Sequence, residues 1–161
     1  MPMPFHLYMT GENQGNISEG ACDIQGREDS ILCQAFDHNV HIPYDIQTGS
    51  TTAKRVHDAI KITKVFDKSS PKLYQALCTG ETITEAVLKF FKVIGSTETH
   101  YFSIKIEDGR LVSIKPWVPN CLDPTKATFT HMEDVSFTYR KITWTWEVDG
   151  IESEDDWTVA R

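Results

Sequence analysis

The chain has 161 residues, of which 40% are apolar and 24% charged, and its formal net charge is −7. A chain of this length and composition can bury a core without disulfide bonds, which excludes global disorder and favours one domain over residues 1–161. The acidic balance repels phosphate backbones and anionic lipid surfaces, so neither nucleic acid nor a membrane is an expected partner.

Alternation of apolar and polar residues dominates the first part of the chain and predicts strands. Phe5, Leu7 and Met9 are expected on one face of a first strand, and a polar loop follows at 11–20. Residues 31–43 are typical of one long strand, since apolar residues recur there at alternate positions. The N-terminal part is therefore expected to contribute two strands to a sheet.

Residues 43–54 contain Pro, Asp, Gly, Ser and three Thr, and have little apolar content of their own. This composition predicts a loop or an extended hairpin. Alternation resumes at 60–66, where Ile60, Ile62 and Phe66 are expected on one side of a strand.

The clearest helix signal begins with Ser-Ser-Pro at 69–71, which offers an N-cap serine followed by proline at the first helical position. Apolar residues then recur at helical spacing as far as Leu77, and Gly80 supplies the stop. A helix of about three turns is too short to be stable alone, so it must pack on the sheet.

Residues 82–94 have mixed propensities, and their Thr, Val, Ile and Phe favour a strand over a helix. A clean alternation follows at 100–106. Asp108-Gly109 is typical of a hairpin turn, with 111–118 as the returning strand. Residues 120–126 are expected to form a loop.

The last strand carries a break in its apolar phase. Val135, Phe137 and Tyr139 share one parity, and the apolar residues of 142–148 share the other. A β-bulge at Arg140-Lys141 would put both sets on the same side of a sheet. The whole pattern predicts a mainly β chain of seven or more strands with one short helix, as in a barrel or a sandwich.

Candidate catalytic and metal-binding groups are weak. His38 and His41 lie three apart in a predicted strand and would point to opposite faces, so they cannot chelate one metal. Asp37 precedes His38, but adjacent strand residues cannot form a relay and no G-x-S-x-G motif is present. The acidic run at 152–156 follows a turn at 149–150, lacks the spacing of a calcium loop, and is expected to be a solvated tail. We predict no catalytic residue, no metal and no cofactor.

Two aromatic or basic features remain. His57 follows Arg55, and no sequence neighbour would make it a general base. Trp144 and Trp146 share a strand parity and could line a ligand site, but such pairs are more often core or subunit interface. The sequence therefore favours a protein that is not an enzyme.

The cysteines are widely spaced and form no C-x-x-C pair; they are Cys22, Cys33, Cys78 and Cys121. The N-terminus lacks a positive segment followed by an apolar one, so no secretory signal peptide is expected. We therefore expect folding in a reducing compartment with free thiols, which leaves open export by a route that needs no signal peptide.

Six short segments occur along the chain in a fixed order. They are YMTGE at 8–12, GNI at 15–17, QAFDH at 34–38, KRVH at 54–57, FDKSSPKL at 66–73 and VSFTYRKITW at 135–144. Together they resemble the haemolysin-coregulated protein (Hcp) family, which forms the tube of bacterial type VI secretion systems. The resemblance extends from about residue 4 to about residue 157.

This resemblance implies a two-sheet β-barrel with one short α-helix on its flank and an extended hairpin loop. It also implies a homohexameric ring with a central channel, whose rings stack into a tube behind a spike protein and are expelled by a contractile sheath. Some members hold effectors in the lumen. The implied location is the bacterial cytoplasm, followed by secretion through the type VI system.

The resemblance assigns the hairpin loop to contacts with a neighbouring subunit or ring. The interface residues that it implies are Ile42, Pro43, Tyr44, Asp45, Gln47, Thr48 and Lys54. Asp37 matches the position of a small polar residue on the family's lumen face, and here that residue is acidic. Two alternatives stay open, a dedicated effector chaperone and a monomeric β-barrel that binds a small ligand.

Overall fold

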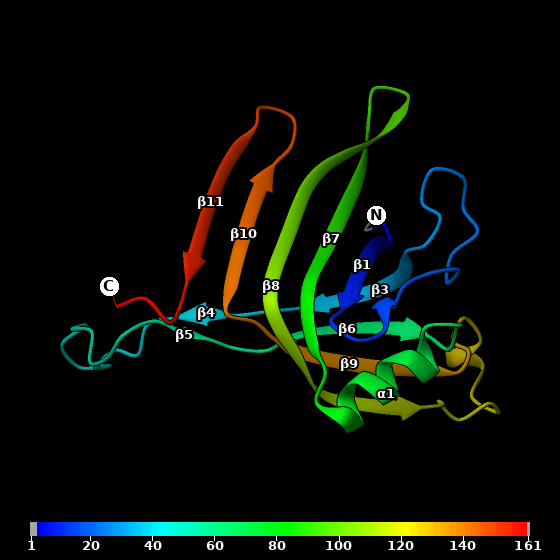
Figure 1. The fold of residues 1–161 in the computed structure, drawn as a ribbon, viewed down its shortest axis with the longest axis horizontal. Coiled ribbons are helices and arrows are strands. Elements are labelled where there is room, and N and C mark those ends of the chain that lie inside the picture. Colours follow the sequence, from blue (N-terminus) through cyan, green and yellow to red (C-terminus); the bar gives the residue numbers. More distant parts are fainter. Residues whose placement is uncertain (1–2, 161) are drawn as a thin grey trace.

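The computed structural model describes residues 3–160 and consists mainly of antiparallel strands (Figure 1). The elements in chain order are β1 (Phe5–Gly11), β2 (Gly15–Asn16), β3 (Ile31–Asp37), β4 (Val40–His41), β5 (Val56–His57), β6 (Ile60–Val65), α1 (Ser70–Thr79), β7 (Thr82–Ile94), β8 (Thr97–Trp117), η1 (Pro124–Lys126), β9 (Met132–Thr138), β10 (Lys141–Trp146) and β11 (Ile151–Asp156).

Six strands close into a barrel. Their order is β8-β7-β1-β3-β6-β9, and pairing between β8 and β9 joins the two ends. The long β8 has 21 residues, which lets its first part pair with β7 and its last part with β9. The mainly β barrel with one flanking helix is therefore confirmed.

Asp108 and Gly109 mark the bend of β8 and do not form a hairpin turn. Asp108 has a positive φ of 52°, and a Cβ added at Gly109 would lie 2.6 Å from the carbonyl oxygen of Thr138. The close approach of β9 therefore requires glycine. The predicted turn is wrong because the local Asp-Gly preference is used here for a bend, and the true hairpin joins β7 to β8 at Gly95, where φ is 64°.

The break in apolar phase near Arg140 separates two strands. β9 pairs with β6 and the end of β8, whereas β10 pairs with the beginning of β8. Tyr139 and Arg140 lie between them, and the Arg140 amide donates to the Glu107 carbonyl at 3.1 Å. The expected result is found, since Phe137, Tyr139 and Ile142 are all buried, but the cause is a break between two strands that pair with different parts of β8 rather than a bulge within one strand.

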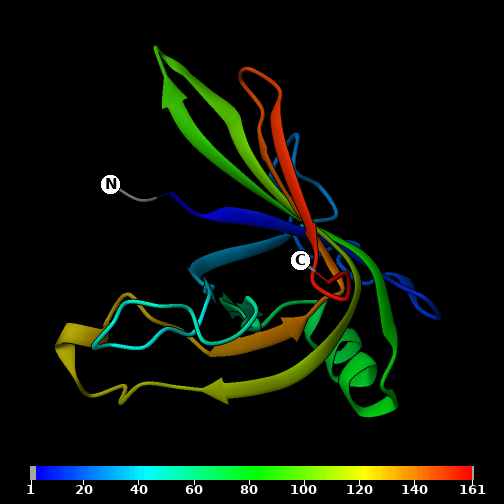
Figure 2. The same ribbon diagram turned by 90° about the vertical axis from the view of Figure 1, so that its left-hand side faces the viewer.

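The acidic residues 152–156 belong to β11, which pairs with β10 along its whole length. Most of these residues are exposed, as expected, but they form a strand and not a tail. Figure 2 shows the consequence: β7, β8, β10 and β11 rise as a blade away from the layer that contains β6 and β9. β11 is the outermost strand of this blade.

Other boundaries also differ from the sequence interpretation. The long strand predicted at 31–43 ends at Asp37, and β4 begins after a two-residue break. Phe66 follows β6 and is 48% exposed, so it does not share the buried side of Ile60 and Ile62. The loop predicted at 11–20 contains β2, which pairs with β1.

The helix agrees with its prediction in position and in its glycine stop, but the Ser69 side chain makes no capping hydrogen bond. It runs from Ser70 to Thr79 with Pro71 in its first turn, and Gly80 closes it with a φ of 67°. Leu73 and Ala76 are buried against the barrel. The strand favoured at 82–94 is also confirmed as β7.

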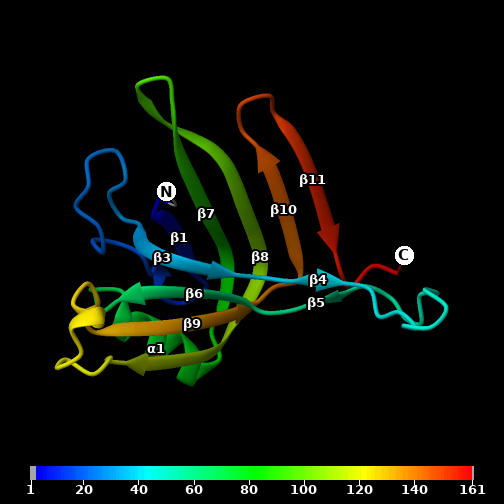
Figure 3. The ribbon, with the colours of Figure 1, turned by 180° about the vertical axis from the view of Figure 1, so that it is seen from behind.

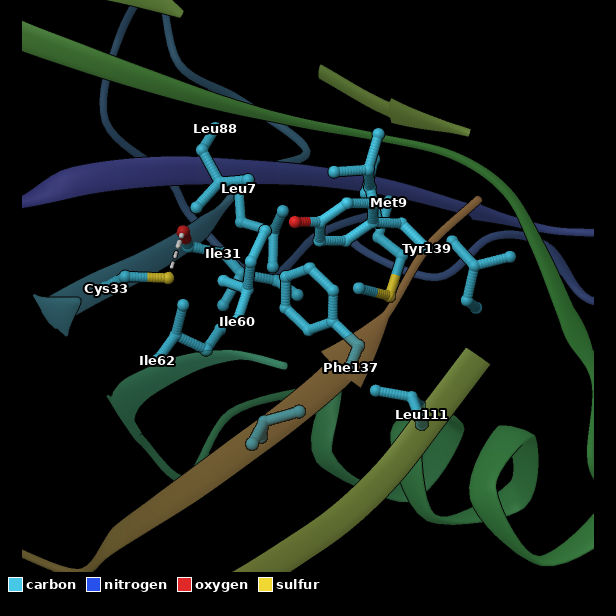
Figure 4. Packing of buried hydrophobic residues seen from close by; sticks show 14 of the residues in the cluster. Leu7, Met9, Ile31, Cys33, Ile60, Ile62, Leu88, Leu111, Phe137 and Tyr139 are labelled. Carbon is cyan, nitrogen blue, oxygen red and sulfur yellow. Dashed lines mark hydrogen bonds between the residues drawn. The ribbon is translucent and has the colours of Figure 1, made fainter. Parts of the chain in front are cut away.

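Apolar side chains from every barrel strand fill the interior (Figure 4). Leu7, Met9, Ile60 and Ile62 are completely buried, as the alternation predicts. The four cysteines are free thiols, and Cys33 lies within this core.

One buried ion pair joins the barrel to the helix entrance. The Lys64 ammonium is fully buried, and it contacts the carboxylates of Glu133 and Asp67. It also donates to the Ser70 hydroxyl at 3.1 Å and to the Val65 carbonyl at 3.0 Å. Removing one partner of such a pair leaves an uncompensated buried charge.

We predict that Lys64→Met lowers the free energy of unfolding by about 3–5 kcal/mol, because Glu133 loses its cation. Lys61→Met is the matched control, since its side chain is 51% exposed and should change stability by less than about 0.5 kcal/mol. Urea titrations measure both. Equal midpoints for the two variants would contradict a structural role for the buried pair.

His6 is buried as well, because β1 lies in the middle of the sheet and the segment before β3 covers its second face. The imidazole lies 2.9 Å from the Ser30 hydroxyl through Nδ1, and its ring meets Phe91 edge-on at 5.6 Å. Burial, with the Arg27 charge, lowers the pKa of His6 to about 4.

This depressed pKa predicts that stability falls as the pH decreases from about 6.5 toward about 4, because the unfolded chain takes up the proton first. His6→Leu should reduce that slope, whereas His41→Gln, at an exposed histidine, should keep it. Unfolding free energies measured across this pH range test the prediction, and identical slopes in the two variants would refute it.

Candidate assembly surface

The segment at 42–54, here called the arm, is an extended hairpin that continues the β4–β5 ribbon. Backbone hydrogen bonds close it from Asp45 to Ser50 at 2.8 Å and from Thr52 to Pro43 at 2.9 Å. Figures 1 and 3 show it projecting beyond the barrel at the end where β11 finishes. Of the two predicted forms, loop or hairpin, the hairpin is present.

The apolar side chains of the arm face solvent. Ile42 is 48% exposed, Tyr44 64% and Ile46 88%. Alternate positions thus present three large apolar groups on a segment that has no core beneath it, which is typical of a protein interaction site. Ile46 was absent from the interface residues that the resemblance implied, although an apolar residue at the tip of a polar hairpin is a signal for it.

The other implied interface residues also lie on the surface of the arm. Asp45, Gln47, Thr48 and Lys54 are exposed, and Pro43 is half-buried. The Asp45 carboxylate accepts a hydrogen bond from the backbone N–H of Gln47 at 2.8 Å and so stabilises the turn.

Asp37 lies apart from the arm, at the end of β3, and is exposed. It pairs across the strands with Lys61 of β6. A hollow of about 180 Å³ is lined by these two residues together with Ala35, Phe36 and Thr63. The structure therefore places the candidate lumen residue on a polar outer face of the barrel.

A chain of hydrogen-bonded side chains lies at the base of the arm. The Tyr139 hydroxyl is 2.7 Å from His38 Nε2 and 2.7 Å from His57 Nδ1. His57 Nε2 is in turn 2.7 Å from the Asp155 carboxylate. With Arg55, these residues are called the arm-base chain. The sequence neighbours of His57 did not indicate its partner, Asp155, which β11 brings against it.

Arg55 fixes the outer end of this chain. Its Nε donates to Asp155 at 2.6 Å, and Nη2 donates to the carbonyls of Asp156 at 2.9 Å and Val159 at 3.0 Å. The hydrogen bond from Arg55 holds the pKa of Asp155 below its usual range, and burial raises that of Tyr139.

The arm-base chain is not arranged for nucleophilic catalysis. The imidazole of His57 faces the phenol of Tyr139, and the raised pKa of that buried phenol keeps it protonated. A second set joins Ser103 to His100 and Glu147, each at 2.7 Å. Here the serine lies between the histidine and the carboxylate, whereas activation of a serine requires the histidine in the middle.

Within residues 3–160, no cluster of His, Cys, Asp and Glu could hold a metal ion. No helix in that same range is both long and apolar enough to cross a bilayer. Trp144 packs against the core, and Trp146 meets Tyr101 edge-on at 5.7 Å.

The described residues form a closed β-barrel from which an apolar, solvent-exposed arm projects. The family model described as "Type VI secretion system effector, Hcp" matches residues 8–146, and the chain belongs to this family. The family forms the tube of the type VI secretion system and is not an enzyme family.

Individual relatives agree with this assignment. The "Major exported protein" of Pseudomonas aeruginosa is 45% identical, and the match covers 98% of this chain and 96% of that protein. A structure described as "Crystal structure of Hcp protein" has a TM-score of 0.92 at 32% identity and covers 98% of this chain and 99% of its own. The "Secreted protein Hcp3 from Pseudomonas aeruginosa" has a TM-score of 0.81 at 39% identity, over 96% and 97% of the two chains.

Proposed function

We propose that six copies of the chain form a ring, that rings stack into a secretion tube, and that the arm makes the contacts between copies. The observation that carries this proposal is the exposure of Ile42, Tyr44 and Ile46 on a hairpin without a core of its own. Membership of the tube family supports it.

The shape of the chain favours a head-to-tail contact. The arm projects at one end of the molecule, whereas the loop containing η1 lies at the other end of its longest axis (Figures 1 and 3). An arm that meets a different surface on the next copy makes a heterologous contact, and such contacts close into rings or extend into filaments.

The remaining parts of the proposal follow from the ring. Residues 1–161 act as one domain, and the polar face around Asp37 lines the lumen, where its hollow beside Lys61 holds part of an effector. The ring works with a spike protein and a contractile sheath. The exported relative supports movement from the bacterial cytoplasm to the outside through the type VI system.

We predict that the purified chain runs as a hexamer in light scattering and that Ile46→Asp shifts it to the 18.3 kDa monomer, because a charge would enter an apolar contact. The loss in assembly constant should be at least about a hundredfold.

The matched control is Ile24→Asp, which makes the same charge change at an exposed isoleucine outside the arm. It should remain hexameric. A wild-type monomer at every concentration tested would contradict the ring and would favour the alternative hypothesis, a monomeric β-barrel that binds a small ligand.

Ring stacking should respond to salt. At −7 for each chain, six copies carry a formal −42, so rings repel one another over long distances. We predict that screening by NaCl lengthens the tubes, as measured by sedimentation. Tubes that dissociate as salt rises would show that polar contacts between rings outweigh the repulsion.

A further inference from the structure

The arm has little backbone support. Within the described range, β4 and β5 pair with each other in a separate two-stranded sheet, and the ladder of the barrel does not include them. A two-stranded ribbon is marginally stable in water by itself. The direction in which the arm points therefore depends on side chains at its base.

Those side chains are the arm-base chain. His38 precedes β4, Arg55 precedes β5 and His57 lies in β5. The arm-base chain therefore holds both strands of the ribbon. Their partners, Tyr139 and Asp155, come from the barrel and from β11. Trp157 also donates to the Tyr139 carbonyl, which ties the C-terminal segment to the same point.

We propose that Asp155, His57 and Tyr139 are positioning residues that hold the arm in its docking direction, and that protonation of the arm-base chain in mild acid releases the arm. This inference rests on the proposed function of the arm, and the C-terminal strand thereby becomes part of the assembly device.

The proton positions follow from the partners. An ionised carboxylate only accepts, so His57 must donate to Asp155 from Nε2. A neutral His57 then accepts at Nδ1 from the Tyr139 hydroxyl. The Tyr139 oxygen in turn accepts from Nε2 of His38, and every link holds one proton.

One added proton can be accommodated. Placed on Nδ1 of His57, beside the Asp155 carboxylate, it reverses the link to Tyr139. The hydroxyl then donates to Nε2 of His38, and the proton of His38 moves to Nδ1, toward the backbone of Asp58. A second proton cannot be accommodated in the same way. Both imidazolium rings would direct N–H groups at the single Tyr139 oxygen and would repel each other across it.

Other charged groups face this chain without removing the conflict. Asp58 and Asp37 favour a charge on His38, and Arg55 is paired with Asp155. Burial, followed by the nearby His57, nevertheless lowers the pKa of His38. Because this pKa is lowered, the hydrogen-bonded arm-base chain is stable at higher pH and is lost as the pH falls below the ordinary histidine range.

Hydrogen exchange of the arm amides tests the positioning role in the full-length chain. The amides of Gly49 and Thr52 are hydrogen-bonded within the arm and report on its order. At about pH 7.5, Asp155→Asn should raise their exchange about tenfold and weaken assembly in light scattering.

Glu154→Gln is the matched control, because it removes the same charge from an exposed side chain on the same strand. It should leave arm exchange and assembly unchanged. Equal exchange and equal assembly in the two variants would overturn the positioning role.

The release by acid is tested with Tyr139→Phe, which cuts the chain at its centre and keeps the ring for packing. In the wild type, arm exchange, corrected for intrinsic rates, should rise about tenfold from about pH 7.5 to about pH 5. In Tyr139→Phe it should be raised already at the higher pH and change little on acidification. A wild-type arm that keeps its protection at about pH 5 would refute the release.

These outcomes separate the two proposals. If the wild type is monomeric at both pH values, the proposed function fails, whereas hydrogen exchange of the arm amides still reports on the arm-base chain. If the wild type assembles and Asp155→Asn behaves as Glu154→Gln does, only the inference fails.

Discussion

The closure of the barrel by a single bent strand is the constraint on which the other features depend. β8 pairs with β10 as far as Glu107, with β7 as far as Arg110, and with β9 from Arg110 onward. The bend is possible because Gly109 has no Cβ to meet the Thr138 carbonyl. Without it, β8 could not serve both ends of the sheet, and the core around Phe137 and Ile106 would lose one wall.

The same bend determines the position of the C-terminal strands β10 and β11. Because the first part of β8 leaves the barrel as a blade, β10 can pair outside the closed ring of strands and β11 can follow it. This arrangement brings Asp155 against His57, at the base of a ribbon that forms its own two-stranded sheet. The geometry of the arm is thus set by a strand at the opposite end of the sequence.

Features that depend on a few neighbouring residues could be predicted from the sequence, whereas features that depend on pairing between distant strands could not. The alternation at Ile60 and Ile62 and the Ser-Ser-Pro start of α1 gave correct elements, since burial periodicity and the backbone preferences of proline and glycine act over a few residues. Asp108-Gly109 misled because the same φ preference serves a turn or a bend, and only the partner strand decides which.

The candidate site divides in the same way. The arm was predictable from its composition, which cannot fill a core. The acidic run that contains Asp155 has no apolar alternation, so nothing in it indicates a strand, and its partner His57 lies 98 residues earlier. A contact of that separation is fixed by sheet order, which neither segment specifies by itself.

The charges of β11 also affect how the free edge of the blade can pair with another chain. β11 is the edge of the blade, and an exposed edge is a template for pairing with another chain. Glu152, Glu154 and Asp156 make two such edges repel one another, so edge-to-edge growth is opposed. The arm offers apolar contacts without an open ladder. On the proposed assembly, the acidic strand therefore has two roles: it blocks the wrong contact along its free edge, and through Asp155 it holds the ribbon that makes the right one.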